Sequence, residues 1–330
     1  MAGFGRRRRK RTVGVDIGTG FCKAAVIEHG AGAPRLVRVA LAPNETSAGR
    51  GGGGGDPDRV ADAISSMFEQ ERIDARDVVI GIGGRDVMSK VIEIDRMDEE
   101  EACAVIPWEA EQHVPFEMEN VELDFVIIDP DGDGPAMTVL LAAVKRTLVE
   151  ERVSLLRRAG LNPVTVDVDA LALHNALEMN YPSAMQDVTA LVDIGSGSTT
   201  VHLLQGGLPV LTRELAVVAP TPEGLSEAVQ RIARGLRRAG GFVESETHLG
   251  IARVYLCGGG AGAPSLAETL AEKLGVETRL ASAFERLDVA PEVADRPDIG
   301  SIAPMLMLSI GLALRSPIEG PPNPKKRARP

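Results

Sequence analysis

Two short segments of the chain repeat one pattern of residue types 177 positions apart. Residues 15–20 read Val-Asp-Ile-Gly-Thr-Gly, and residues 192–197 read Val-Asp-Ile-Gly-Ser-Gly. In each segment an apolar stretch ends in an aspartate, and a turn of glycine and hydroxyl residues leads into a second apolar stretch. Glycine adopts the left-handed backbone angles with which a tight turn aims several N–H groups at one anion. Two such turns that face each other would hold a polyphosphate between them.

The residue types in these segments predict a site for phosphate and magnesium. We expect Asp16 and Asp193 to hold the water shell of Mg²⁺, because this ion keeps most of its waters and takes few protein carboxylates. Lys23 would place a positive charge near the phosphates, whereas the second copy has Thr200 at the equivalent position. The other predicted cofactor-binding residues of the two turns are Gly18, Thr19, Gly20, Gly195, Ser196, Gly197, Ser198 and Thr199. One segment alone could equally be an ordinary strand end, but the repetition favours a pair of binding turns.

A third glycine cluster, Gly258, Gly259 and Gly260, lies between a predicted strand at 252–257 and a predicted helix at 264–274. Glycines in front of a helix let an anion approach its N-terminus, where the helix dipole favours negative charge. We therefore add these three residues to the predicted cofactor site. The chain has no Gly-x-x-x-x-Gly-Lys-Ser/Thr motif, and no Gly-x-Gly-x-x-Gly opens a helix in a βαβ unit. P-loop and dinucleotide-binding folds are thereby disfavoured.

Hydrophobic periodicity indicates mixed α/β structure along the whole chain. In the first half we expect a hairpin and third strand within 12–40, helices at 57–70, 98–113 and 148–159, and strands at 78–82, 87–94, 122–129, 136–144 and 163–168. In the second half we expect a hairpin at 189–205, a strand at 209–215 and a helix at 223–238. The apolar stretch 302–314 is too short to span a bilayer, so we predict a buried helix with Met305, Met307 and Leu308 in the core.

Length, composition and charge fit a globular protein of about two domains. The chain has 330 residues, 44% of them apolar, and a net charge of −11. Its basic residues concentrate at 6–11 and 325–329, and we expect the first run to be either a solvated tail or a contact with anionic lipid. No apolar stretch follows it, so we do not expect a signal peptide. The acidic body disfavours nucleic acid as a partner, and the three cysteines show no metal-ligand spacing.

The aspartate hairpins and the late Gly-Gly-Gly-Ala resemble the actin, Hsp70 and sugar-kinase superfamily, in which two like lobes hold ATP. Residues 107–116, Pro-Trp-Glu-Ala-Glu-Gln-His-Val-Pro-Phe, and the strand around Asp124-Phe125 narrow the resemblance. They are similar to the PilM family, the actin-like cytoplasmic component of the type IV pilus assembly platform. Further similar segments are 144–145, 159–163, 166–173 and 311–315. The resemblance spans about residues 12–315.

This resemblance implies an α/β, actin-like (ribonuclease H-like) fold of two lobes with an inserted small α+β subdomain. The second lobe is expected to be shortened, because residues 215–222 lead almost directly into a helix where the family usually has a longer stretch that helps enclose the base. The implied parts are a basic arm (1–11), the first lobe (12–86 and 147–187), the insertion (87–146), the second lobe (188–316) and a disordered basic tail (317–330).

The resemblance also implies a function. We expect an adaptor that binds ATP with Mg²⁺, hydrolyses it slowly at most, and binds the N-terminal peptide of a PilN-like membrane protein. It would be cytoplasmic and peripheral at the inner membrane, and self-association stays open. Ala102, Val105, Ile106 and Val114 are candidates for the peptide groove, with packing in the subdomain's own core as the alternative. Two alternative functions are a nucleotide-free scaffold of a pilus or type II secretion platform and a small-molecule kinase.

Overall fold

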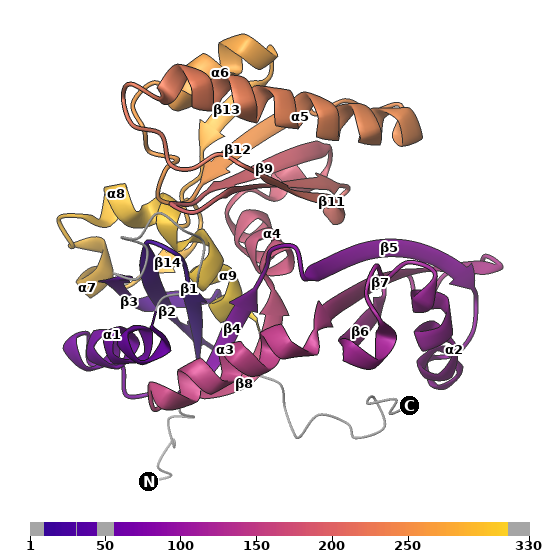
Figure 1. Cartoon of the computed structure of the whole chain (residues 1–330), viewed down its shortest axis with the longest axis horizontal. Helices are drawn as coiled ribbons and strands as arrows, with labels where there is room; N and C mark the ends of the chain where they lie inside the picture. The colour runs from indigo at the N-terminus through magenta and orange to yellow at the C-terminus, as the bar shows by residue number, and fades with distance from the viewer. Residues whose placement is uncertain (1–9, 31, 45–55, 316–330) are drawn as a thin grey trace, which may run out of the picture.

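The structure is a computed structural model that describes residues 10–30, 32–44 and 56–315 (Figure 1). Most of the two basic ends and the glycine run 51–55 lie outside these residues, as do the predictions made for them. Lys10 and Arg11 are the exception. They begin strand β1 (Lys10–Ile17), and Arg11 Nη2 lies 3.0 Å from Glu28 Oε1. Strand β1 thus includes the last two residues of the predicted basic arm.

The first lobe is built on a six-stranded sheet with the order β14-β3-β2-β1-β4-β8. Its main strands are β1, β2 (Phe21–His29), β3 (Arg35–Pro43), β4 (Asp77–Ile82) and β8 (Asn162–Val168). The first three pair antiparallel, and β4 and β8 then add in parallel.

The second lobe repeats this arrangement in a five-stranded sheet with the order β11-β10-β9-β12-β13. Its strands are β9 (Val188–Ile194), β10 (Thr199–Gln205), β11 (Leu208–Leu215), β12 (Arg253–Cys257) and β13 (Glu277–Leu280). Again three consecutive strands pair antiparallel and two more add in parallel. The same strand order in both sheets is the duplicated ribonuclease H-like topology of an actin-like fold, as predicted.

Helices separate and cover the two sheets (Figure 1). Helices α1 (Pro57–Gln70) and α3 (Arg146–Arg158) pack on one face of the first sheet. Helices α4 (Asp169–Asn180) and α9 (Met307–Leu314) share a core with residues of both sheets and so lie between the lobes. Helices α5 (Leu225–Thr247) and α6 (Leu266–Leu274) cover the outer face of the second sheet.

Most helix boundaries lie within two residues of the sequence prediction, but α5 differs more at its C-terminal end. Helix α5 continues nine residues beyond residue 238, through Gly240 and Gly241. Glycine weakens a helix, but Ala239 and Val243 are buried in the second core, and this packing outweighs propensity. Helix α6 begins at Leu266, two residues later than expected.

The C-terminal part of the described chain returns to the first lobe. Strand β14 (Asp288–Val289) pairs with β3, and α7 (Pro291–Ala294), α8 (Ile299–Ile302) and the 3-10 turn η4 (Ala303–Leu306) follow. Helix α9 then packs against β1 and α4, where residues 14 and 311 are both glycine. A Cβ atom on Gly14 would overlap Ser309 O, and one on Gly311 would overlap Ala172 O. The predicted burial is confirmed for Met307 and Leu308, whereas Met305 is half-buried, and helix α9 covers only 307–314 of the predicted 302–314.

A separate three-stranded sheet with the order β5-β7-β6 forms the inserted unit. Its elements are β5 (Val87–Asp95), α2 (Glu99–Glu111), the 3-10 turn η2 (Met118–Asn120), β6 (Val121–Ile127) and β7 (Ala136–Lys145). The Asp98 side chain caps α2 by accepting a hydrogen bond from Glu101 N at 2.8 Å. Ile92, Ile106 and Leu141 are among the residues that join the helix to the sheet in one core.

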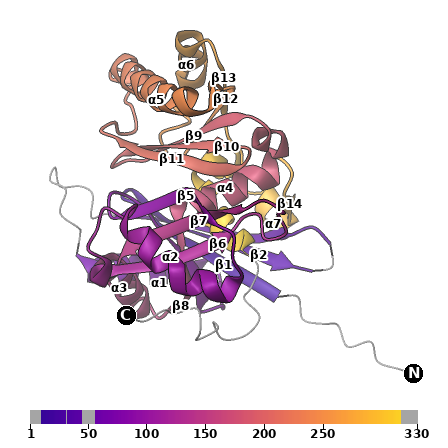
Figure 2. The ribbon, with the colours of Figure 1, turned by 90° about the vertical axis from the view of Figure 1, so that its right-hand side faces the viewer.

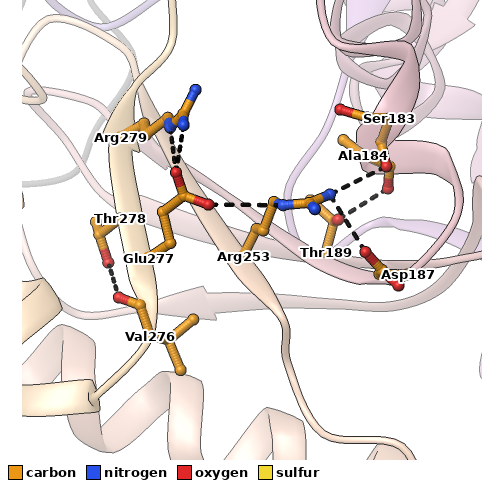
Figure 3. A network of polar contacts seen from close by, with 9 residues as sticks. All are labelled: Ser183, Ala184, Asp187, Thr189, Arg253, Val276, Glu277, Thr278 and Arg279. Atoms are coloured by element: carbon orange, nitrogen blue, oxygen red, sulfur yellow. Dashed lines mark hydrogen bonds and ion pairs between the residues drawn. The ribbon is translucent and has the colours of Figure 1, made fainter.

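A polar network fixes the far edge of the second sheet (Figure 3). Arg253 on β12 contacts Asp187 Oδ2 at 3.2 Å and Glu277 Oε2 at 3.6 Å, and donates to Ser183 O at 3.1 Å. Ser183 belongs to the 3-10 turn η3 (Pro182–Met185) that precedes β9. One guanidinium therefore ties the entry to β9 to the edge strand β13.

Within the described ranges, no helix combines the length and the apolar character that a bilayer span requires.

Candidate functional site

The two predicted turns have the same internal structure. Gly18 N donates to Phe21 O at 3.1 Å, and Gly195 N donates to Ser198 O at 2.9 Å. The hydrogen bond that closes the first turn is thus reproduced 177 residues later. In the part of the chain that the structure describes, the N–H groups of Gly20 and Gly197 take no part in these two turn-closing bonds.

The structure brings these two turns into direct contact. Thr19 Oγ1 and Ser196 Oγ, which occupy equivalent positions in the two copies, lie 2.8 Å apart. The contact depends on glycine next to each hydroxyl residue. A Cβ atom on Gly20 would lie 2.7 Å from Ser196 Oγ, and one on Gly197 would lie 2.8 Å from Thr19 Oγ1. The lobes meet at a pseudo-two-fold point, and a phosphate between them would have to push the turns apart.

Lys23 and Asp16, predicted to serve phosphate and magnesium, form an ion pair with each other. Lys23 Nζ lies 2.6 Å from Asp16 Oδ2, with 13% and 9% of the two side chains exposed. Burial opposes the charge on Lys23, but the attraction of Asp16, with a smaller contribution from Asp193, raises the pKa of Lys23 overall. Lys23 is therefore charged, and Asp16 holds it at the end of β1.

Asp193 ends β9 in the second copy, next to the third glycine cluster. Its pKa is raised to about 6, mainly by burial; Lys23 opposes this shift, and the negative charge of Asp16 contributes to it. Gly258 has a φ of +87°, and a Cβ atom there would overlap Asp193 Oδ1. Residue 258 must therefore be glycine for two reasons: its backbone angle is left-handed, and the Asp193 carboxylate fills the space that a side chain would need.

A third carboxylate, Asp169, lies at this site although the sequence analysis did not select it as a site residue. It is the first residue of α4, and Gly81 and Gly83 leave the space that its carboxylate occupies. Its Oδ1 atom is buried and has no hydrogen-bond partner among the described residues. Burial raises its pKa to about 8, and the charges of Asp16 and Asp193 contribute to this shift. The available signal was an aspartate directly after the predicted strand 163–168.

The third glycine cluster packs against the end of β9. Gly258 N donates to Pro304 O at 2.9 Å, and Gly260 N donates to Ile194 O at 2.8 Å. These two N–H groups hold the loop in place and are not available to a ligand in this conformation. A Cβ atom on Gly259 would have its nearest neighbour at 3.7 Å, so this residue has more room around it. The cofactor role of the three glycines stays a prediction. The free space around Gly259 supports that role better for Gly259 than for Gly258 or Gly260.

The remaining predicted cofactor residues lie at the start of β10. Thr199 is fully buried, and its Oγ1 atom has no hydrogen-bond partner within the described chain. Ser198 is half-buried, and its carbonyl closes the second turn. Residues 216–224 connect β11 to α5 without a helix or strand. This is the place where the sequence analysis expected the second lobe to be shortened.

The residues predicted to line a partner groove lie mostly inside the inserted unit. Ala102, Ile106 and Val114 are buried in the core that α2 forms with its sheet, and Val105 is half-buried. Packing in the core of the inserted unit was the alternative to a peptide groove that the sequence left open for these residues. Side chains enclosed in this way offer almost no surface to a peptide, so only Val105 is kept as a groove candidate.

Comparisons with known proteins match this architecture. The family model "Type IV pilus assembly protein PilM" matches residues 14–219 and 221–317. The chain in the solved structure of a "PilM-PilN type IV pilus biogenesis complex" is 26% identical, with a TM-score of 0.78, over 93% of this chain and 98% of that chain.

Two more distant structures are also similar to this chain. The ethanolamine utilization protein EutJ from Carboxydothermus hydrogenoformans is 17% identical, with a TM-score of 0.49, over 92% of this chain and 89% of that one. The cytoplasmic domain of EpsL, an inner-membrane component of the type II secretion system of Vibrio cholerae, is 14% identical, with a TM-score of 0.46, over 75% and 82% of the two chains. The family model, which matches nearly the whole described chain, decides the assignment: the chain belongs to the PilM family of type IV pilus assembly proteins.

Proposed function

We propose that this chain is an adaptor of the type IV pilus assembly platform that binds the N-terminal peptide of a PilN-like membrane protein. The observation that carries the proposal is the similarity to the chain of the PilM–PilN complex, at 26% identity across 93% of this chain. Binding such a tail would hold the chain, as a peripheral component, at the cytoplasmic side of the inner membrane. A peptide that orders on binding loses conformational entropy, which favours the moderate affinity of a reversible link.

A peptide titration tests this function. We expect a synthetic peptide of the PilN-like protein's N-terminal tail to bind the full chain with a Kd of about 1 µM to 100 µM, measured by calorimetry. The control is a peptide of the same composition in scrambled order. Absence of binding by the native tail, while the protein is folded by circular dichroism, would contradict the adaptor function.

We further propose that Mg-ATP binds between the two turns and closes the lobes around its phosphates. Lys23 pairs with Asp16, so the negative charge of Asp193 has no cation of its own among the described residues, and a divalent cation suits this excess. No group of three or more His, Cys, Asp or Glu side chains in the described ranges is arranged to coordinate one ion, so Mg²⁺ would be held through its waters. Mg²⁺ near Asp16 would release Lys23 to the phosphates.

Hydrolysis by such a site should be slow. A general base must be ionised near the working pH. Asp169, whose Oδ1 atom has no hydrogen-bond partner among the described residues, has a pKa of about 8 and is mostly protonated at neutral pH. We therefore assign the nucleotide a conformational role.

A nucleotide-free scaffold is the second candidate, and two contacts favour it. Thr19 and Ser196 hold the turns together at 2.8 Å, and Lys23 is already paired with Asp16. Calorimetry with Mg-ATP separates the candidates. An ATP-binding adaptor should lose at least about tenfold in affinity in Lys23→Met, a loss of about 1.4 kcal/mol, and lose nothing in the control Lys273→Ala on exposed α6. No heat from the wild type at about 5 mM Mg-ATP would establish the scaffold.

A further inference from the structure

A four-residue segment, 83–86, lies where the carboxylate site, the second lobe and the inserted unit meet. It joins β4, which ends at Ile82, to β5, which begins at Val87. Gly84 has a φ of +96°, so the chain turns sharply here. Gly83, Arg85 and Asp86 each contact a different part of the molecule.

On the side of the two turns, the segment lies directly against Asp169. A Cβ atom on Gly83 would overlap Asp169 Oδ2. A displacement of the Asp169 carboxylate toward residue 83 would therefore meet the backbone of that residue. Asp169 in turn begins α4, a helix that shares a core with both sheets.

On the side of the second lobe, Arg85 Nε lies 3.3 Å from Glu214 Oε2, on β11. Strand β11 is the edge of the second-lobe sheet, and β5 is the edge of the inserted sheet. The two edge strands lie beside each other, as Figures 1 and 2 show from two directions. The second lobe thus contacts the inserted unit along one strand, with the ion pair at one end of the contact.

At the base of the inserted unit, the segment holds both of its ends. Asp86 Oδ1 lies 2.5 Å from Lys145 Nζ, and Lys145 N donates to Asp86 O at 3.0 Å. Val87 N also donates to Gly84 O at 3.3 Å. A rotation of residues 83–86 would therefore move the start of β5 and the end of β7 together.

From these contacts we infer that residues 83–86 and Glu214 form a coupling segment that passes relative movement of the lobes to the inserted unit. The lobes touch at Thr19–Ser196 and again at Arg85–Glu214. Separation of the turns by a ligand changes the angle between the lobes and so shifts β11 against β5. Arg85 and Glu214 are positioning residues here. The inference rests on the proposed function only for the identity of the two ligands.

The first experiment needs no ligand. Gly197→Ala should wedge the turns apart, because its Cβ atom would meet both branches of the Thr19 side chain at 2.8 and 2.9 Å. We expect hydrogen exchange to rise in the turns and also in β5 and β11. Addition of Arg85→Ala should reduce the wedge-induced change in β5 by at least about half. An equal change in β5 with and without Arg85, or none while the turns open, would overturn the inference.

The second experiment measures peptide affinity with and without Mg-ATP. In the wild type we expect the nucleotide to change the Kd of the PilN-like tail peptide by about fivefold or more, and in Arg85→Ala or Glu214→Ala by less than about twofold. The swap Arg85→Glu with Glu214→Arg should restore the change. The matched control is Arg158→Ala, which breaks another exposed ion pair, that with Asp58 at 2.9 Å.

The two experiments keep the inference and the proposed function apart. If the peptide does not bind the wild type, the adaptor function fails, and if the nucleotide does not bind it, the proposed Mg-ATP site fails. In either case the exchange measurement alone decides the inference. If both ligands bind and the Arg85 and Glu214 variants keep the wild-type ratio of affinities, the coupling segment is wrong and the adaptor function stands.

Discussion

At the scale of residues, the site is a group of carboxylates with one lysine. Asp169 has a pKa of about 8, above its ordinary value, so the folded state keeps a proton that the unfolded state releases near pH 4. The stability that this group contributes is present below about pH 4 and is lost as the pH rises from about 4 to about 8. From pH 7 to pH 8 we expect the free energy of unfolding to fall by about 1 kcal/mol, and Asp169→Asn to remove most of this slope. Above pH 8 the buried thiols of Cys22 and Cys257, whose pKa values burial raises, add a loss of their own. Urea unfolding at each pH measures the slope.

His202 gives this experiment an internal check. Burial lowers its pKa to about 4, so the stability tied to its neutral form is lost as the pH falls from about 6.5 to about 4. This loss lies outside the range from pH 7 to pH 8 and should persist in Asp169→Asn. An unchanged slope between pH 7 and pH 8 in that variant would show that another group titrates there.

At the scale of elements, α9 depends on its close approach to β1 and α4. Gly14 and Gly311 are both needed for this contact, because a Cβ atom on either would overlap backbone atoms that cannot rotate away. We expect Gly311→Ala to lower the free energy of unfolding by about 3 kcal/mol or more, or to prevent folding. Urea denaturation followed by circular dichroism measures the loss.

Gly241→Ala in α5 is the matched control. Nothing lies within 4 Å of a Cβ atom there, so the helix should gain up to about 1 kcal/mol from the replacement. A wild-type midpoint for Gly311→Ala would mean that α4 and α9 can separate without loss of stability. The close packing described here would then be incorrect.

At the scale of the whole molecule, the two chain connections of the inserted unit to the first lobe lie side by side. Lys145 N donates to Asp86 O at 3.0 Å, so the two ends of the unit are neighbours. We expect replacement of residues 87–144 by two glycines to leave both lobes folded and any Mg-ATP binding intact, because the two large sheets and α4 and α9 do not include the removed residues. Binding of the PilN-like tail peptide should be lost.

Circular dichroism and calorimetry with each ligand check this deletion. It exposes apolar side chains at the base, including Leu148 and Val168, so the melting temperature should fall by several degrees, about 2–4 °C for each kcal/mol lost. Retention of peptide affinity within about twofold would place the docking surface on the lobes instead.

The sequence by itself determined the elements, the duplication and the family. Strand and helix periodicity and turn chemistry are local properties, so helix α1 and the two aspartate hairpins were predicted within a few residues. The motif at 107–116 indicated the family before any fold was known. These features depend on neighbours in the chain, which a sequence displays directly.

Only the tertiary structure decided what the site residues touch. The contact of Thr19 with Ser196, the pairing of Lys23 with Asp16 and the approach of Asp169 depend on which strands lie side by side. The return of α9 to the first sheet has the same origin. Helical spacing showed that residues such as Ile106 face something apolar, but packing alone decided that this is their own core. Long-range contacts join residues whose separation in sequence carries no signal of their distance in space.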